Sequence, residues 1–120
     1  MQIKSVLETP IYHKTYNLYK ILYSYHHTVL KLHRYTVWQK CEETTLDILA
    51  AIIHTSHVQG VARGSAICVV SERLDFLKTL IRLARETNTI NQENYVTLQD
   101  YLSEIGRMTG GWLKSVPRSL

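Results

Sequence analysis

Two histidines have the spacing that could hold a metal ion. His54 and His57 stand three residues apart, and side chains at that spacing share one face of a helix. No acid or cysteine stands beside them in sequence to complete a coordination shell, so a zinc or iron site is not expected. The Glu-x-x-His pairs that supply ligands in di-metal helical bundles do not occur in this sequence.

The other residue types that perform catalysis are not arranged in a recognisable pattern. Glu42, Glu43 and Asp47 have no second acid cluster with which to form a catalytic pair. The glycine-rich run GRMTGG begins at Gly106, inside an expected helix, and lacks the strand and lysine of a phosphate-binding loop. We therefore expect no enzyme activity, no cofactor and no metal.

The chain contains two cysteines, Cys41 and Cys68, and both fall in apolar stretches. Two cysteines without a leader sequence do not form a disulfide framework, so both are expected to be buried free thiols. The segment MQIKSVLETP lacks the apolar region of a signal peptide, and no run of 18 apolar residues is present. These features predict a cytoplasmic protein that does not enter the membrane.

Basic residues give the positive indication of function. The net charge is +4, and no Asp or Glu occurs between Thr9 and Cys41, a stretch that contains six of the eight tyrosines. Such a basic and aromatic segment suggests an anionic partner, with tyrosine or histidine rings available to stack on bases. A solvated basic face that acids elsewhere in the fold balance is the alternative. Its basic residues nearest the second helix are Lys31, Arg34 and Lys40.

A second basic group is expected on the third helix. Lys78, Arg82 and Arg85 fall within about 60° of one another around a helix, so they form a ridge that could neutralise phosphates. Asp75 and Glu86 could instead pair with this ridge and leave an ordinary solvated face. The charge pattern therefore indicates nucleic-acid binding without identifying the nucleic acid.

Four segments with helical periodicity must position these residues. Apolar residues recur at alternating steps of three and four and predict helices over 10–27, 36–57, 65–87 and 91–114. Thr9 followed by Pro10, and Asn91, are typical helix starts, whereas Pro117 closes the last helix. Short connections favour antiparallel neighbours, so the chain is expected to form one all-α, up-down-up-down four-helix bundle over residues 1–120.

The third helix carries more apolar surface than a single bundle needs. Its apolar positions cover close to half of the helix circumference, and this wide arc contains a charge. A second buried surface, most simply an interface between subunits, would explain both features, although exposed leucines and a snorkelling arginine could do so too. The interface residues expected are Arg73, Phe76, Leu80 and Leu83.

Four stretches of the sequence resemble one known family. They are PIYHKTYNL from Pro10, RYTVWQK from Arg34, LDFLKTLIRLAR from Leu74 and EIGRMTGGWLK from Glu104. Together they are similar to the accessory variability determinant proteins of diversity-generating retroelements, and the similarity extends over all four helices. That family is related to the four-helix bundles encoded in ribosomal intervening sequences, so an interaction module of that second kind is the alternative.

The resemblance implies a bundle that assembles into a barrel-shaped pentamer and performs no chemistry itself. It implies a reverse transcriptase as partner, and a basic surface that contacts the template RNA or its complementary DNA during mutagenic copying. Arg34 and Lys40 match basic positions of the family's second helix, and Lys78, Arg82 and Arg107 match basic positions of its third and fourth helices. Trp38 stands where the family often has glycine, which leaves the packing at that point open.

Overall fold

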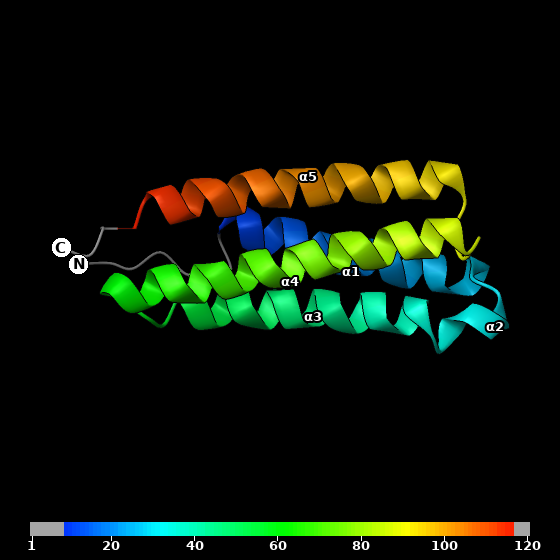
Figure 1. The fold of residues 1–120 in the computed structure, drawn as a ribbon, viewed down its shortest axis with the longest axis horizontal. Helices are drawn as coiled ribbons and strands as arrows, with labels where there is room; N and C mark the ends of the chain where they lie inside the picture. The colour runs from blue at the N-terminus through cyan, green and yellow to red at the C-terminus, as the bar shows by residue number, and fades with distance from the viewer. Residues whose placement is uncertain (1–8, 117–120) are drawn as a thin grey trace.

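Helices form all the regular structure of residues 9–116, as the sequence predicted. The computed structural model describes residues 9–116. Its long helices are α1 (Pro10–Tyr25), α3 (Val37–Thr55), α4 (Gly60–Glu86) and α5 (Gln92–Lys114), and the 3-10 turn η2 (His26–Thr28) and the short helix α2 (Lys31–Arg34) connect α1 to α3. The long helices lie side by side along the 49 Å axis, with α2 at one end (Figure 1).

The long helices form a closed bundle in which chain neighbours are also neighbours in space. Helix α3 packs against α1 and α4, and α5 packs against α4 and α1. Successive long helices run in opposite directions, which gives the expected up-down-up-down order (Figure 1). Each long helix therefore turns one side to the core and leaves an outer side, with two flanks, exposed.

Two helix starts are formed by the capping residues that the sequence indicated. The Thr9 hydroxyl accepts a hydrogen bond from the Tyr12 backbone N–H at 3.4 Å, and Pro10 occupies the first turn of α1. The Asn91 side chain accepts a hydrogen bond from the Asn94 N–H at 2.7 Å. These caps satisfy donors that a helix start leaves unpaired, so local sequence alone determines both positions.

Helix α4 begins at Gly60, five residues before the predicted start, and this boundary was wrong. Gly60 has a φ of +61°, a left-handed conformation that glycine adopts without strain and that turns the chain into α4. The extra turn is held by the end of α5: the Arg63 guanidinium lies 5.6 Å from the centre of the Trp112 ring, and Gly64 faces Val116. Contacts between distant residues thus outweigh the helix cost of Gly64, about 1 kcal/mol.

The turn between α4 and α5 matches its predicted position at Asn88 to Ile90. Asn88 has a φ of +59°, a conformation that asparagine tolerates, and the Thr89 N–H reaches back to the Ala84 carbonyl at 2.8 Å. By contrast, the connection expected from His27 to Tyr35 contains η2 and α2, and α1 ends at Tyr25 rather than at residue 27. Short helical turns of this kind carry too little periodicity to be recognised in sequence.

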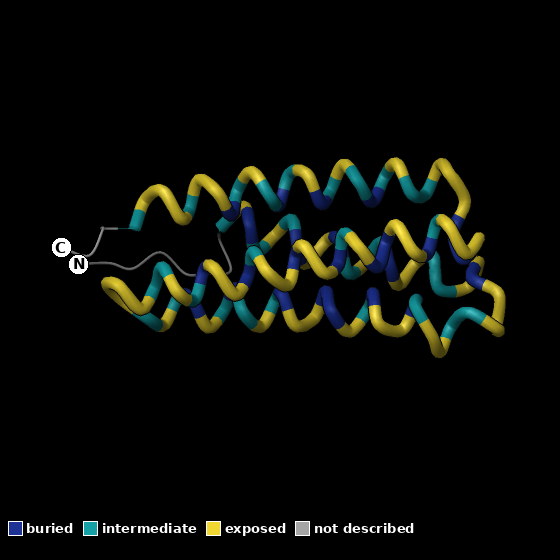
Figure 2. Tube along the Cα trace, in the orientation of Figure 1, coloured by how far each residue is buried: buried dark blue, intermediate teal, exposed yellow. Residues whose placement is uncertain are grey.

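The core lies along the inner sides of the four long helices (Figure 2). Every position of the predicted 3-4 pattern on α4 is buried, namely Ile67, Val70, Leu74, Leu77, Ile81 and Ala84. Trp38, at the start of α3, is fully buried in the same core.

Helix α3 turns only a narrow side to the core. Ile48 and Ile52 are fully buried, but Leu46 is exposed and lies on the outer side of the helix.

Among residues 9–116, no helix is both long enough and apolar enough to cross a membrane. The leader-sequence prediction and the stop at Pro117 concern residues outside the described range.

Candidate nucleic-acid and partner interface

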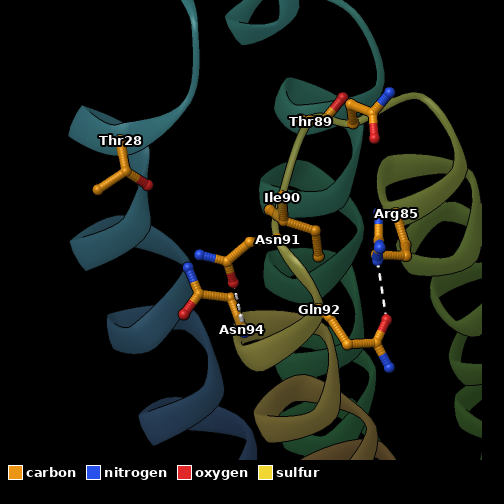
Figure 3. A pocket seen from close by; sticks show the side chains of 8 residues that line it. Thr28, Arg85, Thr89, Ile90, Asn91, Gln92 and Asn94 are labelled. Carbon is orange, nitrogen blue, oxygen red and sulfur yellow. Dashed lines mark hydrogen bonds between the residues drawn. The ribbon is translucent and has the colours of Figure 1, made fainter.

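Three basic side chains lie on the flank of α4 that faces α5. The position of a Cβ atom added to Gly106 of α5 would lie 3.5 Å from Lys78 Nζ. Arg85 Nε donates a hydrogen bond to Gln92 Oε1 of α5 at 2.9 Å (Figure 3). Arg82 lies between them on the same flank, four residues from Lys78 and three from Arg85. We call Lys78, Arg82 and Arg85 the α4 basic flank.

The α4 basic flank keeps its charge uncompensated. The ion pairs within residues 9–116 join His26 to Glu42 and Arg107 to Glu104, and none includes Asp75 or Glu86. The pairing that could have turned this ridge into an ordinary solvated face is therefore not formed. Arg82 is exposed and Lys78 is half-buried, so both ammonium and guanidinium groups can reach a phosphate.

Gly106 of α5 faces α4, with Leu74 Cδ2 at 3.8 Å and Lys78 Nζ at 3.5 Å from the position of an added Cβ. Both are ordinary van der Waals distances, so an alanine would fit here. Gly110 and Gly111 face open space within a helix that continues to Lys114, which means that the helix end is not frayed there.

Arg107 lies on α5 beside Gly106 and is largely exposed. Its guanidinium donates to the carboxylate of Glu104, one turn earlier on the same helix. The pair leaves less net positive charge at this position than on the α4 basic flank. Among the basic residues predicted on α4 and α5, Arg107 is thus the one whose charge a carboxylate within residues 9–116 offsets.

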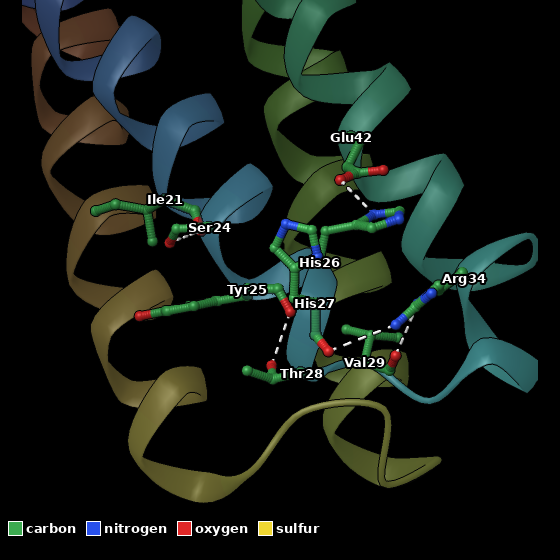
Figure 4. Close-up of polar contacts among 9 residues, drawn as sticks. All are labelled: Ile21, Ser24, Tyr25, His26, His27, Thr28, Val29, Arg34 and Glu42. Atoms are coloured by element: carbon green, nitrogen blue, oxygen red, sulfur yellow. Dashed lines mark hydrogen bonds and ion pairs between the residues drawn. The ribbon is translucent and has the colours of Figure 1, made fainter.

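The structure gives Arg34 a structural role. Its Nε donates to the Val29 carbonyl at 2.9 Å and its Nη2 to the His27 carbonyl at 3.4 Å, so the side chain closes the segment between η2 and α2 (Figure 4). Lys31 and Lys40 are exposed on α2 and in the first turn of α3. These three residues lie at the α2 end of the bundle, the end at which Arg85 of the α4 basic flank lines a pocket with Thr28.

The opposite flank of α4 is apolar. Val69, Phe76 and Leu83 follow one another at intervals of seven residues, and their exposed fractions are 40%, 47% and 45%. Val69 lines a shallow groove together with Ala51, His54 and Val58, which places this flank on the α3 side. We call Val69, Phe76 and Leu83 the α4 apolar stripe. A seven-residue repeat keeps residues on nearly the same side of a helix.

The structure changes one of the four expected interface residues. Leu80 is only 6% exposed and belongs to the core, so it has little surface to offer a partner. Arg73 is exposed in the single chain, so it keeps surface for an interface between subunits. Phe76 and Leu83 remain exposed as the interface requires. Sequence reasoning missed Val69, although its spacing of seven residues before Phe76 was visible.

A second apolar surface lies between α1 and α3. Tyr16, Tyr19 and Tyr23 of α1 line a groove with Leu46 and Leu49 of α3, and Tyr16, Tyr23 and Leu46 are exposed. Lys20 Nζ lies 5.7 Å from the Tyr16 ring centre, a cation–π distance. We call this surface the tyrosine groove. The tyrosine stripe was visible in the sequence, but the pairing with α3 that forms the groove was not.

The two histidines with metal-ligand spacing are not part of a larger ligand cluster. Within residues 9–116, no three His, Cys, Asp or Glu side chains cluster as metal ligands would, and His57 lies beyond the end of α3. Cys41 is buried, and burial, with a smaller contribution from Glu42, raises the pKa of its thiol to about 12. Cys68 is exposed, contrary to prediction, because it lies on the outer side of α4.

Comparison with known protein families decides between the two related bundle types. The bAvd-like family model matches residues 10–116, which include all four long helices. The chain belongs to the bAvd-like family, the accessory variability determinant proteins. Neither the curated proteins nor the solved structures that were searched gave a match.

Membership of the bAvd-like family associates the chain with the machinery of diversity-generating retroelements. The match includes the α4 basic flank, the α4 apolar stripe and the tyrosine groove in one continuous range. It also includes Trp38, so a buried tryptophan at the start of α3 is compatible with the bAvd-like fold.

Proposed function

We propose that this bAvd-like chain is the non-catalytic accessory subunit of a diversity-generating retroelement. In this role it binds the reverse transcriptase of the element and its template RNA or complementary DNA, and so supports mutagenic copying in the cytoplasm. The observation that carries the proposal is the family match over residues 10–116. The proposal gives the protein a binding role, in agreement with a surface made of basic and apolar patches.

The α4 basic flank supports the nucleic-acid part of this proposal. Lys78, Arg82 and Arg85 repeat along one flank over two turns of helix, and no carboxylate within residues 9–116 pairs with them. A row of unpaired cations releases counterions when it meets a phosphate backbone, which favours binding at low salt. Such contacts do not read base identity, as a subunit that handles a template of any sequence requires.

Two apolar surfaces support assembly of the subunit into a ring, for which we propose the pentamer of the family. A closed ring needs a heterologous interface, in which two different patches of adjacent subunits meet. The α4 apolar stripe and the tyrosine groove are two such patches, and they flank α3 on opposite sides. In the proposed ring, Phe76 and Leu83 of one subunit pack against Tyr16, Tyr23 and Leu46 of the next.

Co-purification tests the proposal directly. The full chain is co-expressed with the reverse transcriptase and the template RNA of the retroelement to which the proposal assigns it. A stoichiometric complex, and an isolated subunit whose mass by light scattering is a multiple of the single chain, are expected. A monomer that binds neither reverse transcriptase nor nucleic acid at low salt would contradict the proposal and favour an intervening-sequence-type module.

A further inference from the structure

The most exposed apolar side chains of residues 9–116 lie together on one short segment. The exposed fractions of Leu30, Leu32 and Tyr35 are 65%, 75% and 70%. Covering apolar surface is favourable by about 25 cal/mol per Å², and exposed apolar groups that gather in one place mark interaction sites. This segment includes α2 and stands at the end of the bundle away from the start of α1 (Figure 1).

The segment is fixed in place although its apolar side chains are exposed. Val29 is buried in the core and anchors the chain just before Leu30. The Arg34 guanidinium donates hydrogen bonds to the carbonyls of Val29 and His27 (Figure 4). Thr36 Oγ1 donates to the His33 carbonyl at 3.1 Å. A surface held in its bound shape loses little conformational entropy on binding. This arrangement distinguishes a binding surface from a loose loop.

The charges around the segment define its partner. Lys31 and Lys40 are exposed beside the apolar residues, and no acid occurs between Thr9 and Cys41. The nearest carboxylate in sequence, Glu42, is engaged with His26 at 3.2 Å. Lys31 and Lys40 thus place positive charge beside the exposed apolar residues, while Glu43 is exposed farther along α3. The complementary surface is apolar in its centre and acidic where it meets the two lysines.

We infer that α2 with its flanking residues docks into a partner protein, at an apolar pocket rimmed by Asp and Glu side chains. A nucleic acid fits less well, because bases stack on aromatic rings and would engage Tyr35 but not the two leucines. The inference rests on the proposed function for the identity of that partner, the reverse transcriptase. Protein docking and phosphate binding then use different surfaces, the α2 segment and the α4 basic flank.

The test measures binding of the purified reverse transcriptase to three forms of the full chain. They are the unchanged protein, a variant with Leu30→Ser, Leu32→Ser and Tyr35→Ser, and a control with Val61→Ser. Val61 is 61% exposed and lies at the start of α4, at the opposite end of the bundle. We expect the triple variant to bind the enzyme at least about tenfold more weakly, whereas the control keeps full binding.

The same proteins are tested for binding to the template RNA without the enzyme, and their helix content is measured by circular dichroism. RNA binding and helix content are expected to be equal in all three, because the changed side chains are exposed. Equal enzyme binding by the unchanged and triple-variant proteins would overturn the docking site and leave the proposed function intact. Failure of the unchanged protein to bind the enzyme would refute both. Loss of RNA binding alone in the triple variant would make the segment a nucleic-acid contact.

Discussion

The two flanks of α4 differ in chemistry although they belong to one helix. The flank toward α5 carries Lys78, Arg82 and Arg85, whereas the flank toward α3 carries the α4 apolar stripe. Between them lies the fully buried row that holds the helix in the bundle. A helix that gives only its inner side to the core can therefore offer two surfaces to two kinds of partner.

The separation of the two flanks has a functional consequence. Phosphates neutralised on one flank would not cover the apolar side chains on the other, so a ring of subunits could hold nucleic acid without losing its interfaces. The α4 basic flank is expected to respond to salt, and the α4 apolar stripe is not. Variants that affect one surface and leave the other unchanged test this separation.

The largest effect is expected from the row between the flanks. Leu77 is fully buried, and Leu77→Ala should lower the free energy of unfolding by about 2–5 kcal/mol because it leaves a cavity. Urea denaturation followed by circular dichroism measures this loss. The α4 basic flank and the α4 apolar stripe should then both lose their function, because the helix that carries them is no longer held in the bundle. A change below about 0.5 kcal/mol, the value typical of surface sites, would show that α4 is not held by this row.

Changes on the apolar flank should weaken assembly and leave the single chain folded. Phe76→Ser with Leu83→Ser removes two half-exposed apolar side chains, so the mass measured by light scattering should fall toward that of one chain. Val96→Ser, at an equally exposed position on α5, is the matched control and should keep the assembled mass. An assembled mass unchanged in the double variant would place the subunit interface elsewhere.

Changes on the basic flank should weaken nucleic-acid binding without altering assembly. Lys78→Ala with Arg82→Ala removes two unpaired cations, so the slope of log affinity against log salt concentration should become shallower by about 1.4–1.8. Fluorescence anisotropy with the template RNA measures this slope. Arg107→Ala should have a smaller effect, because Glu104 already compensates that charge. An equal change of slope in the double variant and in Arg107→Ala would contradict the expectation that the ion pair with Glu104 reduces the contribution of Arg107.

The two cysteines should report the difference between interior and surface. At pH 8 a thiol reagent should modify Cys68, which is exposed, and leave Cys41 unmodified until the protein unfolds. Burial raises the pKa of Cys41 from 9.0 to about 12. Between these two pH values, the thiol of Cys41 therefore loses its proton in the unfolded chain but keeps it in the folded chain. The stability that the protonated Cys41 thiol contributes to the fold is therefore fully present below pH 9 and is lost as the pH rises toward 12. Cys41→Ala should reduce this alkaline loss of stability. Equal reactivity of both thiols in the folded protein would contradict the burial of Cys41.

The sequence by itself determined those features that depend on residues close together in the chain. The 3-4 spacing from Ile67 to Ala84 identified the buried row of α4, and Thr9 and Asn91 identified two helix starts. Periodicity and capping are local, because one helical turn relates residues three or four apart. The match to the bAvd-like family likewise needed only the order of residues.

Only the tertiary structure decided which residues of a wide apolar arc meet another helix. Phe76, Leu80 and Leu83 look alike in sequence, yet Leu80 is buried, while Phe76 and Leu83 remain exposed. The early start of α4 and the hydrogen bonds of Arg34 also depend on residues that packing or a chain reversal brings close. Helical spacing shows that a side chain is on a given side of its own helix, but burial depends on where the neighbouring helices lie. The separation of an apolar from a basic flank on α4 is for this reason a property of the bundle.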